Sequence, residues 1–118
     1  MDINTHNTQT SLNISEDVIK TIASEVIKEL PSIYSLSNLP AKLSLLTTPA
    51  TAKPVKIAFV SDSAHIDLGI IVNMNYKIKD VAEHLQIAIK DAIQDMTGIT
   101  VSKVNIYVTS VHINSENK

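Results

Sequence analysis

The sequence predicts an α+β domain in which two helices cover one face of a three-stranded mixed sheet, in the order α-β-β-α-β. Two changes of hydrophobic period within residues 65–113 carry this prediction. Apolar residues first alternate as in a half-buried strand, then recur at steps of three and four as in an amphipathic helix, and then alternate again. A strand, helix and strand joined in this way within one sheet form a right-handed crossover with parallel strands.

The first helix is predicted to begin after Ser15 and to end before Pro31. Serine is a favourable N-cap, the two acids after it suit the helix dipole, and proline cannot continue a helix. The expected buried stripe consists of Val18, Ile22, Val26 and Leu30, flanked by Ile19, Ala23 and Ile27.

Residues 31–54 are predicted to form a long loop, because Pro40, Pro49 and Pro54 interrupt any regular element there. The leucines of this segment indicate that part of it packs, with a short helix expected over 41–47. Two interpretations stay open: a semi-ordered cover on the core, or a hydrophobic flap that docks onto a partner.

Two strands joined by a turn are predicted next. The first comprises Val55, Ile57 and Phe59 alternating with Lys56, Ala58 and Val60. Ser61-Asp62-Ser63 has turn composition, so the second strand should begin near Ala64. The core row of this second strand is expected to be Ile66, Leu68, Ile70, Val72 and Met74.

The second helix is predicted from about Lys79 to Thr97, with Gly98 as a left-handed C-cap and Ile99 as its hydrophobic contact. Its expected stripe is Val81, Ala82, Leu85, Ala88, Ile89, Ala92, Ile93 and Met96. The third strand should span 103–113. Its alternation slips before Val111 and Ile113, and a β-bulge near Thr109 and Ser110 would restore both to the core side.

The same alternation predicts which residues lie on the opposite face of the sheet: Ala58, Val60, His65, Asp67, Gly69, Ile71, Asn73, Asn105 and Tyr107. This face mixes apolar and polar side chains, and an open sheet also leaves exposed edges. We therefore expect a candidate interaction face for a second copy or another protein, made of Val60, His65, Asp67, Ile71, Asn73, Asn105 and Tyr107.

Composition limits the classes of function. The 118 residues suit one domain, predicted over 14–114 with disordered tails at 1–13 and 115–118. Cysteine is absent, so neither a disulfide nor a thiolate metal site is expected. The net charge of −2 and the absence of arginine disfavour nucleic acid as a partner. We expect a cytoplasmic protein, because we find no secretory signal and no apolar run of spanning length.

Residue clusters that could carry chemistry are incomplete. His65 and Asp67, with His112 from another strand, would be a minimal metal set, but no motif spacing supports it. His84 should face solvent, and Ser61, Asp62 and Ser63 fit a turn better than a catalytic site. A KH-type RNA clamp needs a GxxG loop, which the two separated glycines do not supply. We therefore expect no catalytic residue, metal or cofactor.

One conjunction of segments resembles a known family. HIDLGIIV is followed by Tyr76, then by IKDVAEHLQIAIKDAIQDMTGITV and VNIYVTSVHI, and ISEDVIKTIASEVIKELPSI precedes them. In this order and spacing they resemble the alkaline shock protein family of envelope stress response proteins, found mainly in Gram-positive bacteria. The resemblance covers about 14–113. Lys77, Pro31-Ser32 and Ser110 stand where the family usually has glycine-containing turns.

The resemblance implies a function that the residue pattern alone does not. It suggests a non-catalytic scaffold or adaptor in cell-envelope stress response and homeostasis that self-associates and reaches the membrane through an anchored partner. Direct membrane insertion is not expected, because neither helix has a basic polar face. Two alternatives stay open: a regulator of a metabolic enzyme, such as one of lipid synthesis, and a small KH-like RNA-binding module.

Overall fold

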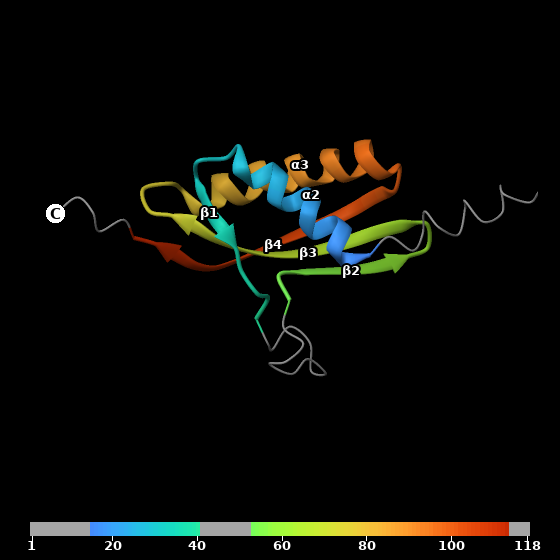
Figure 1. The fold of residues 1–118 in the computed structure, drawn as a ribbon, viewed down its shortest axis with the longest axis horizontal. Coiled ribbons are helices and arrows are strands. Elements are labelled where there is room, and N and C mark those ends of the chain that lie inside the picture. The colour runs from blue at the N-terminus through green and yellow to red at the C-terminus, as the bar shows by residue number, and fades with distance from the viewer. Residues whose placement is uncertain (1–14, 41–52, 114–118) are drawn as a thin grey trace, which may run out of the picture.

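A computed structural model describes residues 15–40 and 53–113 of the chain. Its elements are α2 (Glu16–Lys28), β1 (Ile33–Leu36), β2 (Val55–Val60), β3 (Ser63–Asn73), α3 (Ile78–Thr97) and β4 (Thr100–His112). Figure 1 shows both helices on one side of the sheet, which confirms the predicted α+β class. No helix in the described ranges has the length and apolar character needed to span a membrane. The expected tails and the helix over 41–47 lie outside the described residues.

The predicted number of strands is wrong, because the sheet has four strands. Ile33–Leu36 was predicted to be loop and instead forms β1, antiparallel to the end of β3. The four-residue strand has a register shift around Tyr34 and only one buried residue, Ile33. It therefore shows no alternation in the sequence. β1 is extended because its backbone forms hydrogen bonds with the backbone of β3.

β3 is the central strand of the sheet. β4 runs parallel to it along one edge, from the pair Ser63↔Thr100 to the pair Asn73↔His112. β2 and β1 share the other edge, β2 pairing with residues 63–68 and β1 with residues 70–72. The predicted parallel crossover is confirmed. The structure also gives the strand order, which the hydrophobic pattern does not determine: β4 lies beside β3 and not beside β2.

Gly69 lies where β2 ends and β1 begins along that shared edge. Its N–H donates to the Pro54 carbonyl at 2.9 Å, and its own carbonyl accepts from the Ser37 N–H at 2.9 Å. A Cβ at this position would collide with the Ser37 carbonyl oxygen. Glycine is therefore required because another part of the backbone approaches closely, a usual reason for glycine inside a strand.

The hydrophobic core lies between the helices and one face of β3. Ile66, Leu68, Ile70 and Val72 are fully buried there, as predicted. α3 buries Val81, Leu85, Ile89 and Ile93, and α2 buries Ile19, Ile22 and Ala23. Two residues of the predicted helix stripes are wrong, because Val18 is 43% exposed and Met96 is 64% exposed. They occupy the terminal turns of their helices. Ile113 was predicted on the core side and is also wrong, because it lies beyond the end of β4 and is 66% exposed.

The predicted caps and bulge are confirmed. The Ser15 hydroxyl accepts a hydrogen bond from the Val18 N–H at 3.2 Å. Gly98 adopts a φ of 77° and Ile99 is buried. The β3–β4 register moves from Ile70↔Val108 to Ile71↔Ser110, so the bulged residue is Thr109. Val111 then pairs with Val72 on the core side, although it remains 41% exposed at the end of the sheet.

Leu85→Ala should lower the free energy of unfolding by about 2–5 kcal/mol, because it removes a fully buried side chain from the middle of α3. Ile87→Ala is the matched control on the same helix, since Ile87 is 63% exposed, and its effect should stay within about 0.5 kcal/mol. Denaturant unfolding of both variants measures this. Equal losses would show that the buried face of α3 has been assigned wrongly.

Gly69→Ala should destabilise the fold by about 1–3 kcal/mol, because the new methyl group collides with the Ser37 carbonyl. It should also reduce the hydrogen-exchange protection of the Ser37 amide, which donates to Gly69. Gly98→Ala is the control, because a Cβ there meets no atom and the cost comes from the positive φ alone. An unchanged Ser37 amide in Gly69→Ala would contradict the collision.

A candidate interaction surface on the open face of the sheet

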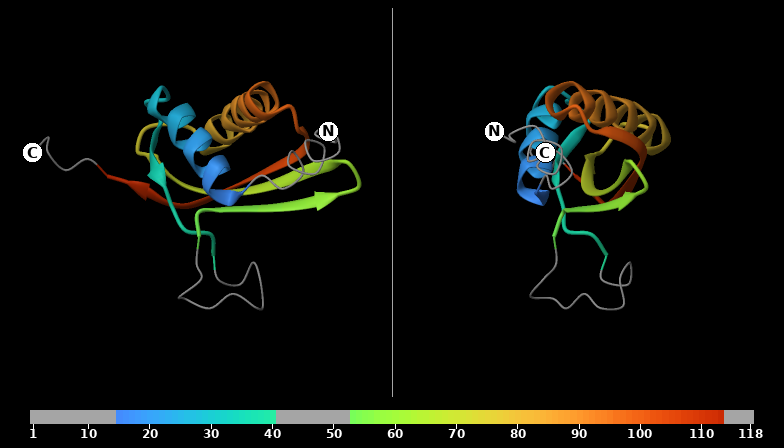
Figure 2. Two further views of the ribbon diagram at one scale, coloured as in Figure 1. Left: turned by 45° about the vertical axis from the view of Figure 1, so that its right-hand side comes forward. Right: turned by 90° about the vertical axis from the view of Figure 1, so that its right-hand side faces the viewer.

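The face of the sheet opposite α2 and α3, over which the described part of the chain places no helix, is called the open face from here on. Figure 2 shows, in both turned views, that the helices lie together on the other side. Cross-strand pairing places on the open face all the residues predicted for it: Ala58, Val60, His65, Asp67, Gly69, Ile71, Asn73, Asn105 and Tyr107. The geometry therefore brings the predicted interaction residues onto one surface, although it does not test their role.

One half of the open face is polar. Asp67 lies between Lys56 on β2 and Asn105 on β4, and the Asn105 Nδ2 donates to the Asp67 Oδ1 at 2.8 Å. His65 lies between Ala58 and Lys103 in the neighbouring row. Partial burial raises the pKa of the Tyr107 hydroxyl, and the negative charge of Asp67 raises it further. Both effects favour the neutral phenol, the form that the ordinary pKa of 10.0 already gives at physiological pH.

The other half of the open face, at the end of β3, carries a pair of stacked rings. Tyr34 of β1 stacks on His112 of β4, with ring centroids 3.8 Å apart and planes 10° from parallel. The Asn73 Nδ2 donates to the Pro31 carbonyl at 2.9 Å, so this predicted interaction residue ties the entry of β1 to β3. Sequence reasoning missed Tyr34, because it lies in the segment that was predicted to be loop. The available signal was that β3 is longer than β2, so the end of β3 beyond Leu68 needed another strand to pair with.

The backbone that leaves β1 separates the two halves. The Ser37 carbonyl lies against Gly69 on the open face, and the Ser37 and Thr109 hydroxyl oxygens are 2.5 Å apart. Thr109 Oγ1 also donates to the Ile70 carbonyl at 3.3 Å. The bulged residue of β4 is therefore held from two sides. The lone glycine in β3 was the available sequence signal for this close approach.

The minimal metal set considered for the sequence is not assembled. His65 and Asp67 lie in adjacent rows, whereas His112 pairs with Asn73, eight residues farther along β3. At about 3.3 Å per residue, the separation is about 26 Å. Within residues 15–40 and 53–113, no group of three or more histidine, cysteine, aspartate or glutamate residues could hold a metal ion.

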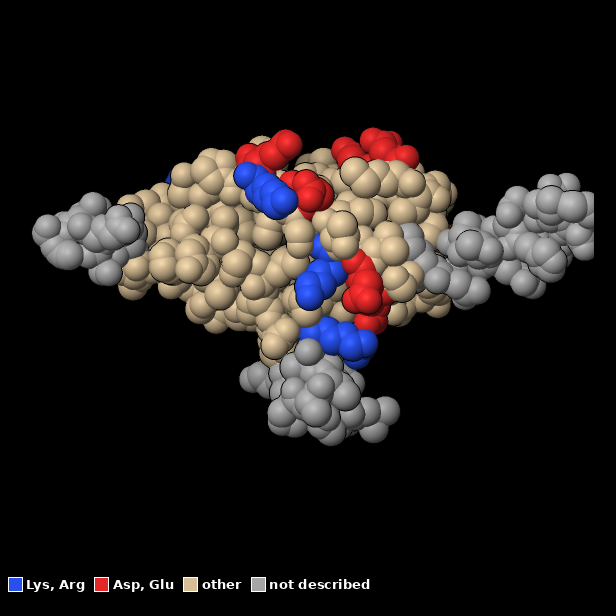
Figure 3. Space-filling view, viewed as in Figure 1, with Lys and Arg blue, Asp and Glu red and all other residues tan. Residues whose placement is uncertain are grey.

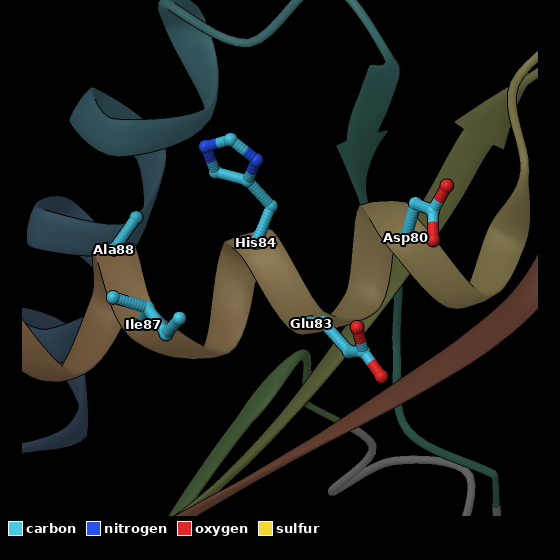
Figure 4. Close-up of a pocket in the computed structure, with 5 residues that line it drawn as sticks. All are labelled: Asp80, Glu83, His84, Ile87 and Ala88. Carbon is cyan, nitrogen blue, oxygen red and sulfur yellow. The ribbon is translucent and has the colours of Figure 1, made fainter.

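An open hollow on the outer side of α3 is lined by Asp80, Glu83, His84, Ile87 and Ala88. Figure 4 shows His84 and Glu83 pointing to opposite sides of the helix. His84 is exposed, as predicted, and it forms no acid–base pair with Glu83 in this arrangement. The hollow therefore offers the solvent-facing side of a helix and no set of complementary catalytic roles.

Charge is distributed unevenly over the surface. In the view of Figure 3, charged side chains of both signs lie over α2 and beneath it, and a group of acidic side chains lies over the end of α3. The Lys53 ammonium lies 2.6 Å from a Glu16 carboxylate oxygen, and this hydrogen-bonded partner raises the pKa of Lys53. The part of this view where β1 and the end of β4 lie is largely uncharged. A surface of this kind suits protein contact better than contact with phosphate.

Comparisons with known proteins identify the family of this chain. Residues 4–113 match the sequence model of the alkaline shock protein 23 family, which is described as having a cell envelope-related function. The resemblance seen in the sequence is thereby confirmed. The uncharacterized protein YloU of Bacillus subtilis (strain 168) is 26% identical over 106 residues, which cover 86% of this chain and 88% of YloU.

A comparison with solved structures matches MamM CTD variants at a low level. A zinc form has a TM-score of 0.45 and 11% identity, covering 86% of this chain and 89% of that one. A nickel form also has a TM-score of 0.45 and 11% identity, covering 84% and 99%. Likeness at this level carries no argument about metals, assembly or function.

The Tyr107 phenol should titrate above its ordinary pKa of 10.0, in an ultraviolet phase that Tyr107→Phe removes. Because the fold favours the neutral phenol, its contribution to stability is complete below pH 10 and is lost as pH rises through the folded pKa. Asp67→Asn should lower this pKa only in part, because burial is the larger cause. A full return to the ordinary value would show that the charge of Asp67 dominates.

Proposed function

Because this chain belongs to the alkaline shock protein 23 family, whose function is cell envelope-related, we propose that it is a non-catalytic protein–protein adaptor. In this proposal it works on the cytoplasmic side of the envelope, self-associates, and reaches the membrane through an anchored partner protein. The partner binds the open face. The observation that carries the proposal is that no helix within residues 15–40 and 53–113 covers the open face of the four-stranded sheet.

The composition of the open face supports protein contact. Val60 is 50% exposed and Tyr34 is 53% exposed, and the half-buried Ile71 and Tyr107 lie between them along the sheet. Aromatic and aliphatic side chains inside a polar surround are typical of protein interfaces. The Asp67–Asn105 pair, joined at 2.8 Å, supplies a fixed polar element that could select among partners.

Of the two alternatives, regulation of a metabolic enzyme would use the same face and differs only in the identity of the partner. RNA binding gains no support from the described residues. Gly69 lies inside β3 and Gly98 caps α3, so neither glycine belongs to a loop that could clamp a phosphate backbone. Protein contact is the function that the geometry favours.

Ile71→Asp should weaken association without unfolding the domain, because it places a charge at the centre of the open face. Ile87→Asp is the matched control, since it makes the same change on the exposed outer side of α3. Sedimentation velocity over a concentration series reports self-association, and thermal unfolding by circular dichroism reports the fold. Only Ile71→Asp should lose assemblies that form through the open face, whereas an assembly that forms through another element would keep its mass above 12.9 kDa in both variants.

The same variants test the role in the envelope. In a host that lacks the gene, the wild-type chain and Ile87→Asp should restore resistance to alkaline and cell-wall stress, whereas Ile71→Asp should not. If a folded Ile71→Asp chain restores resistance fully, the open face is not the working surface. Binding of an RNA pool that falls steeply with salt would instead favour the nucleic-acid alternative.

A further inference from the structure

The outer edge of β4 is not paired with any strand in the described part of the chain, since β4 pairs only with β3. In a strand, the backbone N–H and C=O of successive residues point alternately to the two sides. The Met74 N–H donates to the His112 carbonyl at 3.0 Å, so the backbone of His112 faces β3. We count back along β4 from His112 and allow one extra residue at each bulge. The residues whose backbone N–H and C=O point away from β3, called outward-facing below, are then Val101, Val104, Ile106, Val108 and Val111.

Two glutamines of α3 confirm this direction and cover the first part of the edge. The Gln94 Oε1 accepts from the Val101 N–H at 2.9 Å. The Gln86 Nε2 donates to the Val104 carbonyl at 3.1 Å. These backbone groups would otherwise be open to a neighbouring strand, so the side chains of α3 occupy the edge as far as Val104.

The Thr109 bulge limits the edge at the other end. The extra residue changes which residues of β4 have their backbone N–H and C=O pointing outward, from even to odd numbers. Regular pairing with an outside strand therefore cannot continue through the bulge. Between these limits, the outward-facing residues are Ile106 and Val108. Residues 106–108, called the free stretch below, are therefore centred on Tyr107. They include no charged residue and no proline, which are the usual protections of an edge strand.

We propose that two copies of this chain associate by antiparallel pairing of their β4 edges, with the two-fold axis at Tyr107. Ile106 pairs with the partner's Val108 and exchanges both backbone hydrogen bonds with it, and symmetry repeats this pair. Tyr107 lies opposite the partner's Tyr107 on the open face. The inference deepens the proposed function, because it rests on the self-association proposed above and names the element that mediates it.

The free stretch of β4 fits a second copy of itself. An isologous antiparallel pair must read the same from both strands. The stretch meets this requirement because its two outward residues lie at equal distances from Tyr107. On the core side, the partly buried Ile106 and Val108 pair apolar with apolar across the axis. The two open faces then become one continuous surface, and the short paired stretch makes the dimer concentration-dependent.

Cysteine cross-linking tests this register directly, because the native chain has no cysteine. In the proposed pairing, residue 107 and its copy form a non-hydrogen-bonded pair with Cα atoms about 4.5 Å apart, which suits a disulfide. Tyr107→Cys should therefore oxidise to a covalent dimer about tenfold or more faster than random collision allows. Asn105→Cys is the matched control on the same strand and face, and its two copies would be about 13 Å apart.

A second cross-link keeps Tyr107 in place. Ile106 should lie opposite the partner's Val108, so a mixture of Ile106→Cys and Val108→Cys chains should form a heterodimeric disulfide that neither variant forms alone. Val108→Pro gives a third readout. It removes an outward N–H, which an edge strand tolerates, and it should reduce the mass in solution to that of a monomer with the fold intact.

Rapid oxidation of Tyr107→Cys together with the mixed cross-link would establish the register. If the wild-type chain self-associates but neither cross-link forms, the β4 edge is not the contact, and the open face remains the proposed surface. A wild-type chain that stays monomeric at every concentration, with no cross-link, overturns the pairing. The Ile71→Asp test in cells then decides the adaptor function independently.

Discussion

Pairing along both edges of β3 is the constraint on which the rest of this structure depends. One edge takes β4 over its full length, and the other takes β2 and then β1. Gly69 makes this second arrangement possible, because the chain passes against it with no room for a side chain. The core then forms on one face alone, since both helices join the sheet from that side.

The open face is a consequence of the same arrangement. Each strand contributes alternate residues to it, so one face carries an apolar core row while the other carries Asp67, Asn105 and Tyr107. Asp67 and Asn105 bond to each other and Asn73 bonds to the Pro31 carbonyl, whereas Val60, Ile71 and Tyr34 form the apolar part. A fold that had buried this face under a third layer would have left the chain no broad surface for a partner.

The outer edge of β4 carries backbone groups that need hydrogen-bond partners. An edge strand exposes donors and acceptors that must be satisfied by water, side chains or another strand. α3 satisfies two of them through Gln86 and Gln94, and the Thr109 bulge interrupts the edge farther along. The stretch that remains is short and uncharged.

The sequence alone determined the α+β class, both helices, the caps at Ser15 and Gly98, the core row of β3 and the bulge at Thr109. All of these depend on local periodicity or on one residue's conformational preference. The tertiary structure decided the existence of β1, the place of β4, the collision at Gly69 and the cover over the β4 edge. These features depend on contacts between residues distant in the chain, and β1 is too short and irregular to show a period of its own.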